Sequence, residues 1–166
     1  MKNLPSVMIR LAEKTDLEFV VRTERIEGYE ELTARWTIEE HEIAYSRPDT
    51  RYLVGQNVSG AAIGFIILQP FDDPHEGTKI KRIVVERPGQ GIGRALLEAA
   101  FTWIYQRTQS PRIWLDVFVH NTRAVAAYRA AGMSLDGVLR AAYRLPDGRR
   151  VDRHVMSLLR EEWQGG

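Results

Sequence analysis

The hydrophobic and polar positions of the chain follow two periods, which predict a mixture of strands and helices. Apolar and β-branched runs predict strands at residues 7–11, 52–56, 61–69, 79–85, 112–119, 135–144 and 151–159. Apolar residues three and four positions apart predict a helix after residue 91, whose buried stripe is Ile92, Ala95, Leu96, Ala99, Trp103 and Ile104. The same spacing predicts an earlier helix after a cap at Thr15 or Asp16, with a stripe of Leu17, Val20, Val21 and Glu24.

Short polar motifs mark the ends of two more helices. Thr37 and Glu40 form the Thr-x-x-Glu pattern of a capping box, and that helix is expected to end before Pro48. Asn121 is a favourable N-cap for a short helix, and Gly132 ends it as a C-cap. Asn-Val-Ser-Gly and Pro-Asp-Gly turns separate the strands of two predicted hairpins.

The order of these elements predicts the fold class. It runs as one strand, two helices, three strands, helix, strand, helix and two strands, so hairpins at both ends enclose a strand–helix–strand crossover. We therefore expect an α/β fold with a mixed central sheet of about seven strands and about four helices. A doubly wound nucleotide-binding fold would alternate strand and helix throughout and does not fit. No linker or repeat divides the 166 residues, so a single domain of residues 1–166 is expected.

Composition and charge exclude several classes of protein. The formal net charge of +1 gives no reason to expect nucleic acid as the main partner. The chain has no cysteine, which excludes disulfides and cysteine nucleophiles, and its four histidines lack metal-ligand spacing. The longest apolar stretch, residues 61–68, has the length of a strand, so no membrane contact is expected. These features predict a soluble, cytoplasmic protein without a metal site.

Three alternate glycines, Gly89, Gly91 and Gly93, separate the strand at 79–85 from the helix that follows it. They either allow a tight turn or clear side chains where a phosphate approaches the N-terminus of the helix. The dinucleotide-binding fingerprint has a different glycine spacing, and the P-loop requires a Gly-Lys-Ser/Thr tripeptide that the chain lacks. By themselves, the glycines support the turn and the phosphate site equally.

A second stretch, LDVFVHNTRAVAAYRAAGM at residues 115–133, favours the phosphate site. Together with QGIGRALL at residues 90–97, it resembles the GNAT superfamily of acetyl-CoA-dependent N-acetyltransferases, whose first motif binds the pyrophosphate of the cofactor. Residues 136–159 are similar to the closing hairpin of the branches that acetylate ribosomal proteins and amino acids. The resemblance implies cofactor contacts at Val84, Val85, Arg87, Gly89, Gln90, Gly91, Ile92, Gly93, Arg94, Asn121 and Tyr128.

The resemblance implies a GNAT-like fold and an activity. Acetyl-CoA, bound as a cosubstrate, would give its acetyl group to a primary amine on a protein N-terminus, an amino acid, a polyamine or another small molecule. The family architecture implies two parallel strands that splay after Val85 and offer backbone N–H groups to the thioester carbonyl. The absence of cysteine supports direct attack by the amine in a ternary complex. The closing hairpins of the family imply a possible homodimer.

Tyr128 and Asp116 are the two catalytic candidates. Tyr128 lies two helical turns after Asn121 on the same side, and the resemblance implies that it protonates the departing thiolate; spacing alone favours core packing. Asp116 is a candidate base, as are Glu86 and Glu24, and its alternative role is an ion-paired scaffold carboxylate. An acidic run near the expected acceptor groove either attracts a cationic amine or faces solvent: Glu27, Glu30 and Glu31.

Two other functions remain open. The family often places a glutamate on the strand before the glycines, where this chain has Lys79, and Pro88 replaces a usual Gln or Arg. These two departures motivate a non-catalytic CoA-binding regulatory module, although Arg87 would offer a nearby guanidinium. The third hypothesis is a nucleotide-binding protein that holds ATP on its glycine loop.

Overall fold

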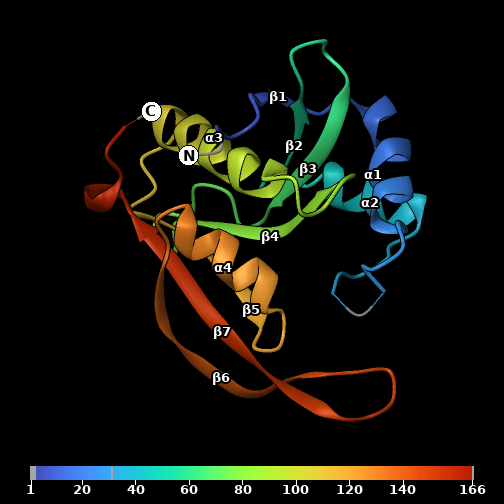
Figure 1. Ribbon diagram of the computed structural model, residues 1–166, viewed down its shortest axis with the longest axis vertical. Helices are drawn as coiled ribbons and strands as arrows, with labels where there is room; N and C mark the ends of the chain where they lie inside the picture. Colours follow the sequence, from blue (N-terminus) through green and yellow to red (C-terminus); the bar gives the residue numbers. More distant parts are fainter. Residues whose placement is uncertain (1–2, 31, 166) are drawn as a thin grey trace.

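The computed structural model describes residues 3–30 and 32–165, which form seven strands, four α-helices and two 3-10 turns (Figure 1). The order and type of the strands and α-helices confirm the predicted fold class, and only the 3-10 turns η1 and η2 were not anticipated. The elements are β1 (Met8–Leu11), η1 (Lys14–Asp16), α1 (Leu17–Glu24), α2 (Ile38–Tyr45), β2 (Arg51–Gln56), β3 (Ala62–Leu68), β4 (Thr78–Val85), α3 (Ile92–Arg107), β5 (Arg112–Phe118), α4 (Thr122–Ala130), β6 (Ser134–Arg144), β7 (Arg150–Leu159) and η2 (Arg160–Glu162).

The sheet has the order β1-β2-β3-β4-β5-β7-β6, and its neighbours are antiparallel except for the central pair, β4 and β5. The crossover through α3 makes this pair parallel. The two strands pair only where Thr78 faces Ile113 and Lys79 faces Trp114. The expectation that they part after Val85 is therefore wrong, because the gap already opens at Ile80.

The early opening follows from the other partners of the two strands. β4 continues along β3, whereas β5 stays paired with β7 over its whole length, from Arg112 opposite Leu159 to Phe118 opposite Arg153. Each half of the sheet carries its own twist, so the two central strands are drawn apart. The result is a wedge-shaped gap in the middle of the sheet.

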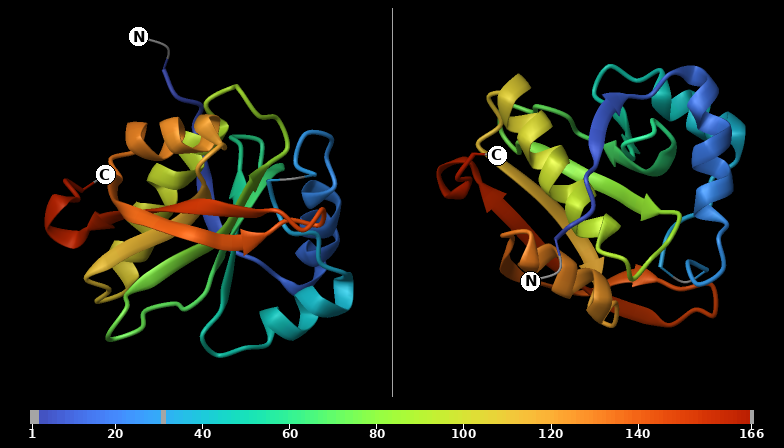
Figure 2. Two further views of the ribbon diagram at one scale, coloured as in Figure 1. Left: turned by 90° about the horizontal axis from the view of Figure 1, so that it is seen from below. Right: turned by 45° about the horizontal axis from the view of Figure 1, so that its top comes forward.

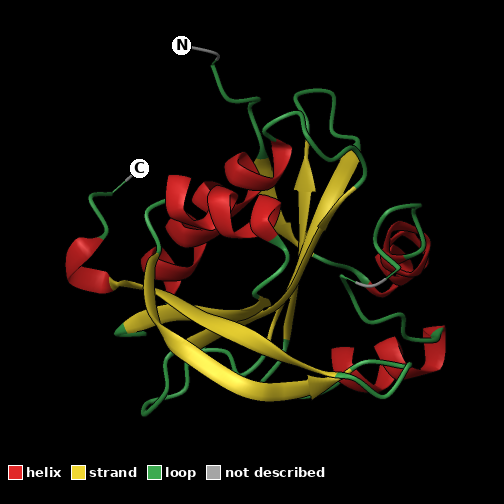
Figure 3. Ribbon diagram, turned by 60° about the horizontal axis from the view of Figure 1, so that its bottom comes forward, coloured by secondary structure: helices red, strands yellow, loops and turns green. Residues whose placement is uncertain are grey.

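Helices cover the two faces of the sheet in pairs. Ile66 and Leu68 of β3 join a core with α3 and α4, and the alternate residues Phe65 and Ile67 join a second core with α1 and α2. This alternation is the period of two that a strand buried on both faces shows. Figure 2 and Figure 3 show α3 and α4 on one side of the sheet and α1 and α2 on the other, while the tip of the β6–β7 hairpin reaches toward the side of α1 and α2.

The N-terminal capping of α2 is as the sequence predicts, whereas the capping of α1 differs from the prediction. The Thr37 hydroxyl accepts from the Glu40 N–H at 3.2 Å, and the Glu40 carboxylate accepts from the Thr37 N–H at 2.7 Å, which confirms the capping box. Asp16 stands at the N-cap position of α1 but makes no cap hydrogen bond. Its carboxylate instead holds Arg10 at 2.6 and 2.8 Å, and this guanidinium lowers the pKa of Asp16 below its usual value.

The helices of the described residues are all too short or too polar to cross a lipid bilayer.

Gly64 of β3 offers a test of how tightly the two cores pack against the central sheet. A Cβ on Gly64 would lie 2.8 Å from the Val84 carbonyl oxygen and 3.0 Å from Leu96, whereas a Cβ on Gly137 would meet nothing within 4 Å. We expect Gly64→Ala to lower the free energy of unfolding by about 1–3 kcal/mol because the backbone of β4 must shift. Gly137→Ala is the matched control and should leave it unchanged or slightly raised. Urea denaturation measures both, and equal effects would contradict the prediction.

Candidate active site

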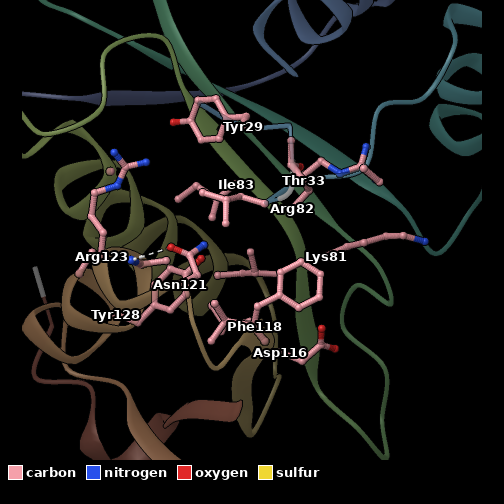
Figure 4. A pocket seen from close by; sticks show the side chains of 18 of the residues that line it. Tyr29, Thr33, Lys81, Arg82, Ile83, Asp116, Phe118, Asn121, Arg123 and Tyr128 are labelled. Carbon is pink, nitrogen blue, oxygen red and sulfur yellow. Dashed lines mark hydrogen bonds between the residues drawn. The ribbon is translucent and has the colours of Figure 1, made fainter. Parts of the chain in front are cut away.

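The gap between β4 and β5 widens into a cleft of about 940 Å³ (Figure 4). One side of the cleft is formed by the glycine loop and by the starts of α3 and α4. The other side is formed by residues 29–30 and 32–36, which follow α1, and by the β6–β7 turn. The cleft therefore reaches both faces of the sheet at its centre.

The three glycines at one end of the cleft differ in the structural feature that favours glycine. Gly89 and Gly91 adopt positive φ values of 84° and 77°, which side chains other than glycine rarely tolerate, so the turn itself requires them. Gly93 is helical and its φ is not positive. A Cβ at Gly93 would meet nothing within 4 Å, and the residue lines the cleft. The first two glycines make the turn, and the third leaves open space that a ligand can fill.

The start of α3 offers an anion-binding site beside that space. Gly91 is the N-cap and contributes no side-chain cap, and the first helical hydrogen bond runs from the Ala95 N–H to the Gly91 carbonyl at 3.0 Å. The N–H groups of Ile92, Gly93 and Arg94 thus have no partner within the helix. They point out of the positive end of the helix dipole, so the site suits a phosphate.

The structure brings most of the predicted cofactor residues to the cleft, but not all. Those lining it are Val85, Gly89, Gly91, Gly93, Arg94, Asn121 and Tyr128. The side chains outside the lining are Val84, Arg87, Gln90 and Ile92. Val84 packs in the core on the other face, Ile92 of α3 packs into the core between that helix and the sheet, and Arg87 and Gln90 are exposed. Arg123, which the sequence analysis missed, lines the cleft close to Tyr29.

The backbone of β4 presents donors to the gap. The Glu86 N–H donates to the Ile63 carbonyl at 2.9 Å, which fixes the edge of β4 that faces β3. Because hydrogen-bonding groups alternate along an antiparallel strand, the N–H groups of Ile83 and Val85 face the gap instead. The Tyr29 hydroxyl donates to the Val85 carbonyl at 3.0 Å and so ties the segment after α1 to this strand. No spacing signal in the sequence pointed to Tyr29.

Tyr128 is buried in the core beside α3 and also lines the cleft, so core packing does not prevent it from facing the cleft. Within residues 3–30 and 32–165, its hydroxyl has no hydrogen-bond partner. Burial raises its pKa well above the usual value, with smaller contributions from Tyr29 and Asp116, so the phenol is protonated at neutral pH. The Asn121 side chain accepts from the Ala124 N–H at 3.3 Å and caps α4 as expected. Figure 4 shows Asn121 and Tyr128 together on the α4 side of the cleft.

Asp116 lines the cleft but is engaged by two cations. Its carboxylate oxygens lie 2.6 Å from the Lys79 ammonium and 2.8 Å from the Arg153 guanidinium, and its side chain is only 9% exposed. This geometry supports the scaffold role that the sequence analysis weighed against general base catalysis. Its assignment as the base stays a prediction.

Glu24 is enclosed in a buried polar network behind the cleft. Its carboxylate accepts from Arg82, lies 3.0 Å from His41 Nε2 and accepts from the Trp36 N–H at 3.3 Å. His41 Nδ1 lies 2.9 Å from the Tyr52 hydroxyl, and burial raises the pKa of Tyr52. Glu24 is fully buried and does not line the cleft, so its position indicates that it holds Arg82 and Trp36 in place.

The remaining acidic side chains are dispersed. Glu86 and Glu27 lie outside the lining of the cleft, whereas Glu30 lines it and accepts from the Gly28 N–H at 2.8 Å. Glu31 lies outside the described residues. Nowhere in the described part of the chain do three histidine, aspartate or glutamate side chains gather as a metal site would need.

Comparison with known proteins gives a family match over most of the chain. The model described as the acetyltransferase (GNAT) family matches residues 17–133. Two curated relatives from Bacillus subtilis are a spermine/spermidine N(1)-acetyltransferase and a probable spermine N(1)-acetyltransferase, each 27% identical over 93 residues. The alignments cover 52% of this chain and 61% of each relative, so the chain spans about three fifths of the length of these relatives.

Solved structures match the whole fold. A chimera of the spermidine N-acetyltransferase from Vibrio cholerae and hSSAT has a TM-score of 0.83 at 24% identity, covering 95% of this chain and 97% of that chain. The Vibrio cholerae spermidine N-acetyltransferase in complex with CoA and spermine has a TM-score of 0.82 at 22% identity, with coverage of 95% and 97%. At this identity the likeness establishes the fold alone.

The open space at Gly93 gives a test with two opposite effects. Gly93→Ala should raise the free energy of unfolding by about 0.5–1 kcal/mol, because alanine favours the helix. The same methyl group should weaken CoA binding about tenfold or more, because it fills the space beside the free N–H groups. Thermal unfolding and calorimetric titration measure the two effects, with Gly137→Ala, outside the cleft, as a control that should leave CoA binding unchanged. Unchanged CoA binding would show that Gly93 is not part of a phosphate site.

Proposed function

The chain belongs to the acetyltransferase (GNAT) family, and from this membership we propose that it transfers an acetyl group from acetyl-CoA to a primary amine in the cleft between β4 and β5. One observation carries the proposal: a phosphate site, two free strand N–H groups and a protonated phenol lie along the same gap. We propose further that residues 1–166 act as one domain, in the cytoplasm where acetyl-CoA and a reducing environment are available.

The residues of the cleft suit each requirement of acyl transfer. The N–H groups at the start of α3, with Arg94 and Arg123, would hold the pyrophosphate of acetyl-CoA. The amine nitrogen attacks the thioester carbonyl carbon, and the N–H groups of Ile83 and Val85 stabilise the negative charge that develops on the carbonyl oxygen. The carbon–sulfur bond then breaks, and the leaving thiolate takes the hydroxyl proton of Tyr128. The new amide nitrogen gives its surplus proton to water, and the Tyr128 phenolate regains a proton from water. The chain has no cysteine to form an acyl-enzyme, which supports direct transfer.

The amine must lose its proton before it attacks, and the charges of the cleft favour that loss. Lys79, Lys81, Arg82 and Arg153 all line it. Neighbouring positive charges lower the pKa of an amine. Lys81 itself shows the effect, because burial, then Arg82 and Lys79, lower its pKa. An acceptor amine in this environment is expected to release its proton to water without a dedicated carboxylate.

The non-catalytic CoA-binding module is the alternative function. Thiol release from acetyl-CoA on a panel of amines distinguishes the two, with mass spectrometry of the acetylated product. CoA binding without thiol release on any amine would favour the module and overturn the proposed transfer.

A homo-oligomer is also proposed. β6 is an edge strand, and its exposed apolar side chains Leu135, Val138 and Leu139 form a surface that a second copy of the chain could cover. A structure of the Vibrio cholerae relative is described as dodecameric. Sedimentation measurements test the assembly state of this chain.

Removal of the Tyr128 hydroxyl tests the proposed acid. Tyr128→Phe should lower kcat by about 10²–10⁴-fold while CoA affinity stays near that of the unaltered protein. Because burial raises the pKa of Tyr128, the unaltered enzyme should show no alkaline loss of kcat below about pH 10. The control is Tyr105→Phe. The Tyr105 hydroxyl donates to the Leu158 carbonyl away from the cleft, so its removal should lower the stability but leave kcat unchanged. A Tyr128→Phe variant with full kcat would rule out this acid.

The pH dependence tests how the amine is deprotonated. As pH increases, kcat/KM should rise around the pKa of the free acceptor amine. The rise in kcat should come at lower pH, because kcat reports the pKa of the bound amine, which the positive charges lower. Lys81→Met removes one positive charge and should shift the kcat profile toward higher pH, whereas Arg107→Gln, outside the cleft, should not. An acidic limb that disappears in Asp116→Asn would instead identify Asp116 as the base.

A further inference from the structure

Positive charge is concentrated at the acceptor side of the cleft. Trp114 and Asp116 of β5 alternate with Leu115, which packs in the core under α3, so they face the side of the sheet opposite α3 and α4. Asp116 holds Lys79 and Arg153 to that face, and Arg82 reaches the Glu24 of α1. In Figure 4, Lys81, Arg82 and Asp116 lie on the side of the cleft away from Arg123.

The carboxylates nearby neutralise only part of this charge. Glu24 pairs with Arg82, and the two further carboxylates of the lining, Glu30 and Asp147, already pair with Arg35 and Arg149. Asp116 is shared by Lys79 and Arg153, so the group of three carries a net positive charge. The Lys81 ammonium donates to the amide oxygen of Gln69 and forms no ion pair among the described residues. The Nε of Arg153 is buried and has no hydrogen-bond partner in the described chain, which leaves it a donor without an acceptor.

The phosphates of CoA do not account for these cations. The phosphate site at the start of α3 follows Val85, and Lys79 lies six residues earlier on β4, about 20 Å away along an extended strand. Arg94 and Arg123 line the end of the cleft where the phosphates are proposed to bind. The cations around Asp116 lie instead where the acceptor must enter, opposite the face that carries Tyr128.

We propose that the acceptor is a primary amine that also carries a carboxylate, and that Arg153 and Lys79 bind this carboxylate. The proposal rests on the proposed acetyl transfer and specifies its substrate class. A guanidinium and an ammonium that already share Asp116 keep further N–H donors for a second carboxylate. A polyamine, the substrate named for the relatives, would bring several positive charges to the same face and be repelled there.

Aromatic side chains complete the acceptor site. The Arg153 guanidinium lies 5.2 Å from the ring centres of both Phe118 and Tyr143, and the Arg82 guanidinium lies 4.3 Å from that of Trp36. Stacking of this kind holds the cations in fixed orientations, so less side-chain freedom is lost when an anion binds. The same rings offer an apolar surface to the remainder of the acceptor.

The test compares amines that differ only in the carboxylate. Amino acids, each beside its own amide, and spermidine are assayed for thiol release from acetyl-CoA, with KM expressed as free-amine concentration so that differences in amine pKa cancel. We expect the KM of an acid to be about tenfold below that of its amide, and higher salt to reduce the difference.

Two variants and a control locate the contact. Arg153→Gln and Lys79→Gln should each raise the ratio of the KM of the acid to that of its amide about tenfold, a ratio in which any effect on deprotonation common to both amines cancels. Arg107→Gln removes an equal charge from α3 outside the cleft and should change neither value. Thermal unfolding of each variant confirms that it is folded before the KM values are compared, and two independent variants keep the test decisive if one fails to fold.

The possible outcomes separate this inference from the proposed function. Acetyl transfer that prefers the amides or spermidine would overturn the anionic acceptor while leaving the acetyltransferase in place. A preference for acids that both variants retain would overturn the role of Arg153 and Lys79. Absence of thiol release with every amine, despite CoA binding, would overturn the proposed function itself.

Discussion

The short pairing between β4 and β5 is the constraint on which the site depends. Two residue pairs join the strands, after which β4 follows β3 and β5 follows β7. The gap leaves the N–H groups of Ile83 and Val85 without a strand partner, as it does the edge of β5 that faces them beyond Trp114. Buried backbone donors without partners are costly, so a ligand that accepts from them gains an interaction that the fold alone does not satisfy.

The buried pair of Glu24 and Arg82 shows how the fold supports charge beside that gap. Removing two charges from water costs free energy that their attraction does not always offset, so such a pair is weak evidence for stability. Here the pair has a positional consequence. Glu24 also accepts from His41 and from the Trp36 N–H, so one carboxylate fixes α2, the segment before it and the guanidinium at the cleft. The network therefore sets the shape of the acceptor side.

The element order, the capping box at α2 and the glycine turn were predictable because local signals encode them. Periodicity reports which face of an element is buried, and Gly89 and Gly91 mark backbone that needs positive φ. The start of the gap at Ile80 was not predictable, because it depends on which neighbour each strand follows. Tyr29 and Arg153 were missed for the same reason: they reach the cleft from distant segments and have no motif of their own. Arg123 lies within the 115–133 stretch, two residues after Asn121, but spacing gave it no role. The prediction that the Asp16 side chain caps α1 was wrong. An aspartate before a helix usually caps it, but here Arg10 binds the carboxylate.

The resemblance to the family places Lys79 where a glutamate is often found, and this difference bears on the chemistry of the site. A glutamate at this position would accept a proton from the incoming amine, whereas a lysine cannot do so while it is charged. The lysine instead joins Arg153 around Asp116, and the resulting positive charge makes a neutral amine more favourable than an ammonium in the same place. A carboxylate on the acceptor would partly offset that charge and hold the amine near the free N–H groups of β4. On the proposed function, the substitution therefore replaces proton abstraction by electrostatic deprotonation, and it ties that step to the charge of the substrate.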